Sequence, residues 1–424
     1  MRRSFVALLA AEAISIFGSR MTFVAVPWLV LVTTGSATRT GVVAFAEMLP
    51  YVLVSAAGGP WVDRFGPART SVVMDAASVV VVAGIPLLYR SGGLSFAALV
   101  GLVAVAGTLR GFGDTGKRVL FPAAVRAGDV SMSRATVVHD GLFRGAGLLG
   151  TPLAGVLISA TDAPTVLFFD AATFAIGAVI VATLVRVDVT PDEPPAPEKR
   201  SYLGQLKDGF DFVRQDRLLL GIAVMVFVTN LLDQANSTVF VPVWAKEIFG
   251  SPVGIGLVAA SFASGAILGN IGYTFLANRF PRYPVYAVGF LIAGAPRYLA
   301  LAFNAPLWTI IAVGFAGGVA IAAVNPILSA VSYERVPQQL VARVLGLSIA
   351  LSFAGIPLGS LLGGLATDHL GGRTALLLAG GLYLGATLLP FLSPVWRQMD
   401  RPAPPAAVPS PRSDAEVTSD PAAH

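Results

Sequence analysis

Ionisable side chains within otherwise apolar stretches are the residues of this sequence best placed to do chemistry. Glu12, Arg20, Glu47, Asp233 and Arg297 all lie inside such stretches. A charge at the centre of a membrane-spanning helix costs about 2.5–3.5 kcal/mol on insertion scales, so residues of this kind are paired or functional. A buried carboxyl group beside a movable arginine can take up and release a proton. These residues are therefore candidates for proton coupling or substrate contact.

Glu47 with Arg20 is the first candidate for proton coupling, followed by Asp233 and then Glu12. On the helical rise of 1.5 Å per residue, Glu47 lies about 9 Å from the end of its stretch and Arg20 about 18 Å from the corresponding end of its own. The two side chains would meet if these helices adjoin. A polar helix face and one arginine are the candidates for lining a substrate cavity: Asn230, Asp233, Asn236 and Arg297.

Twelve long apolar stretches must position these residues. A hydrocarbon core about 30 Å thick requires about 20 helical residues per crossing. The predicted helices cover 5–32, 41–61, 70–89, 96–116, 137–160, 165–185, 218–245, 253–277, 284–303, 307–331, 344–367 and 374–394. The sequence therefore predicts an all-α integral membrane protein.

Composition excludes several classes of function. Only 12% of the residues are charged, against roughly 25% in soluble domains, and the mean hydropathy is +0.75. The net charge of +5 is dispersed over loops, which does not indicate nucleic-acid binding. Cysteine is absent, and the three histidines show no metal spacing. We expect no enzyme activity, no cofactor and no metal, and a monomer whose partners are a small-molecule substrate, protons and the lipid bilayer.

The positive charges between the helices predict the orientation. Twenty-one of the 29 Lys and Arg fall on the side of the N-terminus, and the opposite loops hold only Arg39, Arg90, Lys246 and Arg373. Cytoplasmic loops retain positive charge, so both termini are predicted inside, in a bacterial inner membrane. The predicted organisation is a six-helix bundle at 1–186, a proline-rich cytoplasmic linker at 187–217, a second bundle at 218–396 and a disordered tail at 397–424.

The two halves repeat each other. Gly41 matches Gly256 at an offset of 215 residues, and Pro152 matches Pro357 at an offset of 205. An even number of helices separates the matched positions, so the repeats run parallel. Repeats of this kind place a substrate site near the bilayer midplane, between the halves.

The loop after the second helix carries the most specific motif. Gly59-x-x-x-Asp63-Arg64-x-Gly66, followed by Arg69, resembles the signature loop of the major facilitator superfamily. The resemblance covers roughly residues 5–395 and implies two parallel six-helix pseudo-repeats that transport by alternating access. It also implies that Asp63 and Arg64 help to latch the cytoplasmic side. We expect them to meet a layer of charges there: Asp75, Arg110, Asp114, Asp140 and Arg144.

Arg110 with Asp114, and Asp140 with Arg144, are spaced i,i+4 and can pair on their own helices. The signature loop could instead be a solvated basic turn with no role in latching.

Glycine and proline form a second motif. The fifth and eleventh helices share small residues and proline, which resembles the Gly-Pro motif of antiporters in the same superfamily: Gly147, Gly150, Pro152, Gly155, Gly355, Pro357 and Gly359. Glycine permits close helix approach, and proline weakens the backbone ladder. Ordinary helix packing explains the motif as well as an antiporter role does.

The fourth helix departs from the superfamily pattern. Exporters often carry Arg-x-x-Gln-Gly-x-Gly there, whereas this chain has Gly107 at the Arg position and Arg110 at the Gln position. Residues 111–118 nearly spell a phosphate-binding loop, but Arg118 replaces the Ser or Thr that would hold magnesium. ATP hydrolysis is excluded on that basis.

The predicted function is proton-driven export of a small, largely apolar compound, such as a drug or secondary metabolite. Residues 26–36 most resemble the enterobactin and macrolide efflux proteins of the superfamily. Two alternatives stay open: a nutrient importer on the same fold, and a membrane sensor that transports nothing. Fold alone does not decide the direction of transport.

Overall fold

A computed structural model describes residues 2–187, 210–276, 279–337 and 340–400, and these residues form helices and turns. Twelve of the helices are long and apolar enough to cross a membrane. The predicted tail, most of the predicted linker and the loop residues Ala277 and Asn278 lie outside the described residues.

The first half contains six of the twelve helices and one short one. They are α1 (Arg2–Thr34), α2 (Ala37–Ala57), the short α3 (Gly59–Phe65), α4 (Pro67–Arg90), α5 (Phe96–Ala127), α6 (Met132–Ala160) and α7 (Ala163–Leu184).

The second half contains the other six spans, three of them interrupted. One span joins α9 (Arg217–Ala235), the π-helical η1 (Asn236–Phe240), α10 (Val241–Trp244) and the π-helical η2 (Ala245–Phe249). The remaining elements are α11 (Val253–Leu276), α12 (Arg282–Ala293), α13 (Ala295–Ala302), α14 (Leu307–Ile321), α15 (Val324–Arg335), α16 (Val341–Leu370), α17 (Gly372–Leu392) and the 3₁₀ helix η3 (Pro394–Asp400).

The fourth spanning helix is longer than predicted. Residue 116 was expected to end it, whereas α5 continues to Ala127 and is capped by Gly128. The extra 11 residues add about 16 Å of helix. Because no run of turn-forming residues precedes Gly128, the charged segment that contains Lys117 continues the helix instead of forming a loop.

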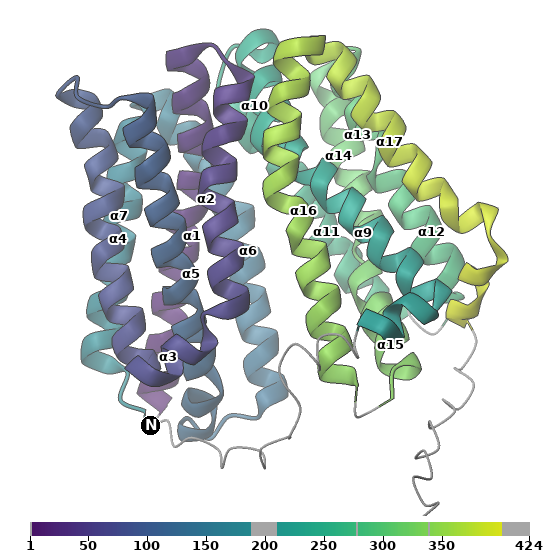
Figure 1. Cartoon of the computed structure of the whole chain (residues 1–424), viewed down its shortest axis with the longest axis horizontal. Helices are drawn as coiled ribbons and strands as arrows, with labels where there is room; N and C mark the ends of the chain where they lie inside the picture. Colours follow the sequence, from purple (N-terminus) through teal and green to yellow (C-terminus); the bar gives the residue numbers. More distant parts are fainter. Residues whose placement is uncertain (1, 188–209, 277–278, 338–339, 401–424) are drawn as a thin grey trace, which may run out of the picture.

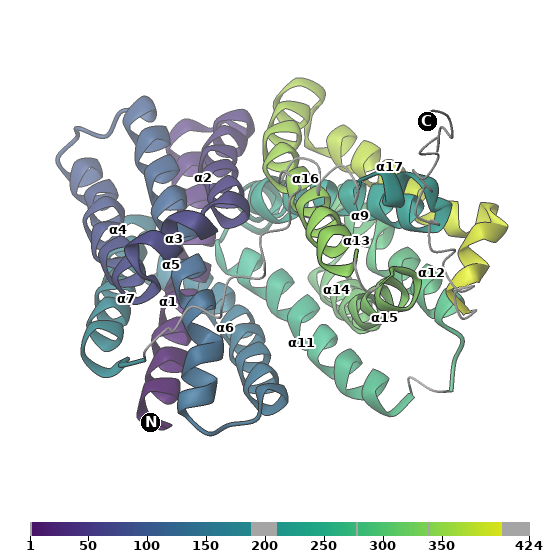
Figure 2. The same cartoon turned by 60° about the horizontal axis from the view of Figure 1, so that its bottom comes forward.

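The two halves meet at one end of the molecule and diverge at the other (Figure 1). We call the end with Arg2, α3 and the α5–α6 turn the terminal face, and the end with the α1–α2 and α16–α17 turns the far face. Across the halves, α16 packs on α2 and α11 packs on α6; Figure 2 shows α11 running beside α6.

The buried apolar clusters show the same division. One cluster joins both halves, but near the terminal face each half has its own, around Leu8 and Leu120 in the first and around Val213 and Val344 in the second.

Glycines of the internal repeat make the far-face contacts. A Cβ on Gly41 would collide with the carbonyl oxygen of Ser360 in α16, and one on Gly256 would lie 2.7 Å from Cα of Pro152 in α6. Since Gly41 and Gly256 are matched positions of the repeat, the two interfaces are pseudo-symmetric. The repeat predicted from the sequence thus has a structural counterpart.

Asp368 adds a polar contact to the far face. Its carboxylate, on α16 of the second half, accepts hydrogen bonds from Ser36 Oγ (2.7 Å), Ala37 N (3.0 Å) and Thr38 N (2.8 Å) at the start of α2. The first backbone N–H groups of a helix have no intrahelical partner and favour an anion. Asp368 therefore caps a helix of the opposite half and holds the far face closed.

Candidate functional site

A cavity of about 460 Å³ lies between the two halves. Its lining is mainly apolar, with side chains such as Phe23, Leu148, Ile255 and Phe262 from both halves. The ionisable residues that line it are Arg20, Arg144, Asp233 and Arg297. A largely apolar cavity with a few placed polar groups is the usual form of a small-molecule site.

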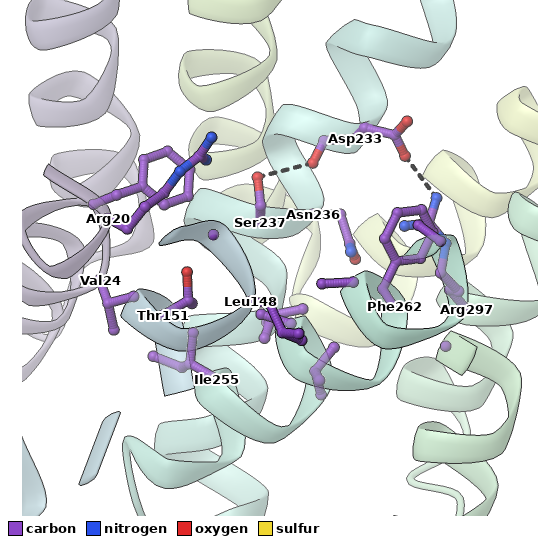
Figure 3. A pocket seen from close by; sticks show the side chains of 18 of the residues that line it. Arg20, Val24, Leu148, Thr151, Asp233, Asn236, Ser237, Ile255, Phe262 and Arg297 are labelled. Carbon is purple, nitrogen blue, oxygen red and sulfur yellow. Dashed lines mark hydrogen bonds and ion pairs between the residues drawn. The ribbon is translucent and has the colours of Figure 1, made fainter. Parts of the chain in front are cut away.

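Asp233 and Arg297 form an ion pair on the second-half wall of the cavity (Figure 3), with 2.7 Å between Asp233 Oδ1 and Arg297 Nη2. The guanidinium also lies 4.8 Å from the ring centroid of Phe262. Two interruptions of helical geometry lie close to this pair. The π-helical turn η1 begins directly after α9, and the break at Gly294 begins α13, which carries Arg297. Such π turns occur frequently at functional sites.

Asn236 lines the same wall, whereas Asn230 does not. Asn236 is 6% exposed, and its side-chain oxygen has no hydrogen-bond partner among the described residues. Asn230 instead donates to the carbonyl oxygen of Ser352 at 3.0 Å, which joins α9 to α16. Three of the four predicted cavity residues therefore line the cavity, and Asn230 has a packing role.

Arg20 occupies the opposite wall of the cavity (Figure 3). Its guanidinium carbon lies 5.5 Å from the ring centroid of Phe143 on α6. Glycines make room for it, because a Cβ on Gly150 would lie 2.9 Å from Cβ of Arg20 and one on Gly147 would lie 3.9 Å from its Nε. No acidic partner of Arg20 is present in the described part of the chain.

The expected pairing of Arg20 with Glu47 is wrong. Glu47, 6% exposed, pairs with Arg110 of α5 at 3.2 Å. The cause is the close approach of α2 to α5 at Gly107, where a Cβ would collide with the backbone of Glu47. Close packing of α1 on α6 turns Arg20 into the cavity instead.

Arg110 connects Glu47 to a second carboxylate. The predicted i,i+4 pair forms, with 4.0 Å between Arg110 Nε and Asp114 Oδ2. Tyr51 donates to the same Asp114 oxygen at 3.2 Å, and its ring centroid lies 4.5 Å from the guanidinium carbon of Arg110. The first half thus contains a network of two acids, one arginine and one tyrosine.

Asp75 belongs to a different cluster from the one expected. It is 1% exposed and pairs with Lys117, also 1% exposed, at 2.8 Å, and Lys117 donates to Ser15 Oγ at 3.4 Å. The predicted helix at 96–116 ends one residue before Lys117. The absence of a run of turn-forming residues between Lys117 and Gly128, which lets the helix continue, was the signal in the sequence for this residue.

Histidine replaces arginine as the partner of Asp140. The expected i,i+4 pair of Asp140 with Arg144 is absent from the ion pairs of the described residues. Instead, Asp140 lies 3.6 Å from His139 Nδ1, and His139 Nε2 lies 3.1 Å from Glu12. Arg144 lines the cavity. Glu12 therefore contacts α6 through His139.

Asp170 is a further buried acid. It is 1% exposed and accepts hydrogen bonds from the hydroxyl groups of Thr22 and Thr173. Among the described residues no lysine or arginine lies within ion-pair distance of it. Its charge within an apolar stretch already marked it in the sequence as a buried ionisable residue.

Comparison with known proteins identifies the family. The sequence model of the Major Facilitator Superfamily matches residues 8–235 and 222–421, which together cover most of the chain. The chain belongs to the Major Facilitator Superfamily. It is therefore a membrane transporter and not an enzyme.

Characterised relatives in the superfamily include efflux proteins. The chain is 29% identical over 413 residues to the multidrug efflux pump Tap of Mycobacterium tuberculosis, covering 96% of this chain and 97% of the relative. It is 20% identical to macrolide efflux protein A of Streptococcus pyogenes, covering 93% and 97%. These are bacterial multi-pass transporters, which places this chain in the bacterial inner membrane.

Solved structures share the superfamily fold. The nucleoside transporter NupG aligns with a TM-score of 0.69 at 14% identity, over 92% of this chain and 98% of that one. A bacterial homologue of the iron transporter ferroportin, in an inward-facing state, aligns with a TM-score of 0.63 at 15% identity, over 91% and 98%. At such identities the likeness concerns the fold alone.

The superfamily signature loop lies on the terminal face. Gly59 begins the short helix α3, and Gly66, with φ +85°, makes the turn into α4. Asp63, Arg64 and Arg69 are exposed and form no ion pair with any described residue. The loop therefore does not latch the two halves in the state seen here, in which their terminal ends are apart.

The Gly-Pro motif of the superfamily lies at helix contacts. A Cβ on Gly155 would lie 2.7 Å from the carbonyl oxygen of Pro252, and one on Gly355 would lie 2.7 Å from that of Phe227. Gly359 approaches Leu231 still more closely, because a Cβ there would collide with the carbonyl oxygen of Leu231. Pro357 lies inside α16, which continues through it. The motif thus brings helices together, and these contacts alone give it no coupling role.

Proposed function

We propose that the chain exports small, largely apolar compounds from the cytoplasm in exchange for protons, by alternating access. The cavity between the halves carries this proposal, because it combines an apolar lining with ionisable residues and lies beneath a closed far face. The export direction is supported by the printed functions of the relatives, a multidrug efflux pump and a macrolide efflux protein.

Transport in membrane vesicles tests this function. Everted vesicles from cells that express the chain should accumulate an exported drug when respiration acidifies their interior, and adding the drug should release protons from the lumen. A chain that moves drug only in right-side-out vesicles would be an importer. A chain that moves neither drug nor protons would be a non-transporting sensor.

We further propose that both termini are cytoplasmic, so the terminal face is the inner face, and that the two bundles at 1–186 and 218–396 move as units. The excess of Lys and Arg in the loops on the side of the N-terminus supports this orientation.

A single cysteine in place of the exposed Glu247, next to Lys246 on the far face, should react in intact cells with a reagent that does not cross the membrane. A cysteine in place of the exposed Arg134 is the matched probe of the terminal face and should react only after permeabilisation. The reverse pattern would overturn the orientation. The native chain has no cysteine, so there is no background.

Proton coupling is assigned to the two carboxylate–arginine pairs, one in each half. Glu47 with Arg110 is the first candidate and Asp233 with Arg297 the second. A buried carboxylate stays charged while its arginine lies beside it, and the protonated form is favoured when the arginine moves away. Glu12 is the third candidate, through its contact with His139.

The signature loop is proposed to act in the opposite state of the cycle. When the terminal ends close, Asp63 and Arg64 come within reach of the second half, where hydrogen bonds to charged groups contribute about 1.5–3 kcal/mol each.

We also propose that one chain transports alone. Light scattering of the purified protein in detergent, combined with its transport rate, would check this.

A further inference from the structure

The charges around the cavity do not balance. Arg297 is neutralised by Asp233 at 2.7 Å. Arg20 and Arg144 also line the cavity, and neither forms an ion pair with any described residue. Among the described residues, the cavity thus holds two positive charges without an acidic partner.

The residues around Arg20 hold its side chain at the wall of the cavity. Phe143 lies against its guanidinium, and the glycine face of α6 removes side chains that would crowd it. Across the cavity, Asn236 is 6% exposed, and its side-chain oxygen is buried without a hydrogen-bond partner among the described residues (Figure 3). A side-chain amide also carries two donors, and Ser237 and Thr151 border the same space. Arg20 is therefore a cation that faces a cavity with hydrogen-bonding groups on its other wall.

The acidic side chains nearest to the cavity already have other partners. Glu47 pairs with Arg110 and Asp233 pairs with Arg297. Asp170 accepts from threonine hydroxyls. None of these carboxylates lies within ion-pair distance of Arg20 in the described structure.

Alternating access makes the missing counter-charge important. In the state seen here, water in the open cavity can solvate the guanidinium. When the terminal face closes around a substrate, that water leaves, and an unpaired buried charge is strongly unfavourable. A planar guanidinium binds carboxylate, sulfonate or phosphate oxygens in a two-pronged geometry.

We infer that Arg20 binds an anionic group of the transported compound, so the cavity selects organic anions with an aromatic or aliphatic body over cations of the same size. This inference rests on the proposed function, because it takes the cavity as the transport site. Phe143 and Phe262 flank the ring system, and Asn236 bonds to polar substituents.

Two probes with one ring system and opposite charges test the inference. The purified chain is titrated calorimetrically with 2-naphthoate and with (2-naphthyl)methylammonium. The wild type should bind the naphthoate more tightly, by on the order of tenfold, as expected for a hydrogen-bonded charge. Arg20→Gln should remove this preference by weakening naphthoate binding alone, and Arg20→Lys, which keeps the charge but not the planar fork, should retain part of it.

Arg39→Gln is the matched control. Arg39 also lies over a phenylalanine ring, 5.3 Å from the centroid of Phe96, but outside the cavity, so its replacement should leave the preference unchanged. Equal or tighter binding of the ammonium probe, binding of neither probe, or a preference that survives Arg20→Gln with an unchanged melting temperature would each overturn the inference. Vesicle efflux of a neutral drug is measured in parallel. If efflux persists, only the anion selectivity fails, whereas its absence in the wild type refutes the proposed function.

Discussion

Replacing Glu47 by Gln is expected to abolish uphill efflux while exchange of substrate down its gradient survives. Glutamine keeps the size of the side chain but cannot take up or release a proton. The alternation of the two halves continues, because the far-face contacts at Gly41 and Asp368 do not involve Glu47. Drug accumulation in everted vesicles and drug-induced proton release should both disappear, and counterflow of labelled drug should remain.

The variant also leaves Arg110 buried with a weaker partner, Asp114 at 4.0 Å. Removing one member of a buried ion pair costs about 3–5 kcal/mol, so a loss of stability must be separated from a loss of coupling. The double variant Glu47→Gln/Arg110→Gln removes both charges and should recover stability without recovering coupling. Glu334→Gln is the matched control, because Glu334 pairs with Arg282 at 2.6 Å on the surface, where ion pairs contribute about 0–1 kcal/mol.

Asp233→Asn distinguishes the two halves as the site of coupling. If Asp233→Asn abolishes uphill efflux and Glu47→Gln does not, the proton is carried by the second half. If both variants keep proton-coupled uphill efflux, neither pair couples transport, and Glu12, the third candidate, becomes the next carboxylate to replace.

Replacing Gly364 by Val is expected to block transport by keeping the far face open. A Cβ at Gly364 would lie 2.5 Å from the carbonyl oxygen of Ala37 and 3.1 Å from Cα of Thr38, which are backbone atoms of the opposite half. Backbone cannot rotate away as a side chain can, and overpacking of this kind costs about 1–3 kcal/mol. That energy corresponds to a shift of about 5- to 150-fold toward the state in which the far ends are apart.

Distances between spin labels measure this shift. Cysteines that replace the exposed Arg39 and Leu370 report on the far face, and cysteines that replace the exposed Arg69 and Tyr333 report on the terminal face. In Gly364→Val the far-face distance should lengthen and the terminal distance should shorten.

Gly101→Val is the control for this substitution, because no atom lies within 4 Å of a Cβ at Gly101. Asp63→Asn should shift the populations in the opposite direction, since it removes a contact made only when the terminal face is closed. Unchanged distances in Gly364→Val would mean that the glycine contact does not control closure of the far face.

The sequence alone determined the architecture of this transporter. Each of the twelve predicted spans overlaps a helix of the structure, because length and hydropathy are local properties that the bilayer imposes on each segment separately. The repeat at Gly41 and Gly256 and the signature loop at Gly59 were also visible, since they depend on residue identity and spacing. The end of the fourth helix was predicted wrongly, because α5 carries charged residues and extends beyond the apolar stretch that hydropathy detects.

Only the tertiary structure decided which charges pair. From the sequence, Arg20 was the expected partner of Glu47 and Arg110 was not considered, because helical spacing gives the height of a residue along its helix but not the neighbour it faces. The close approach of α2 to α5 at Gly107 selected Arg110, and the glycines of α6 turned Arg20 toward the cavity. The same limit concealed the pair of Asp75 with Lys117 and the contact of Glu12 with His139. An ion pair across helices depends on rotation and spacing set by packing, and these are properties of the whole bundle.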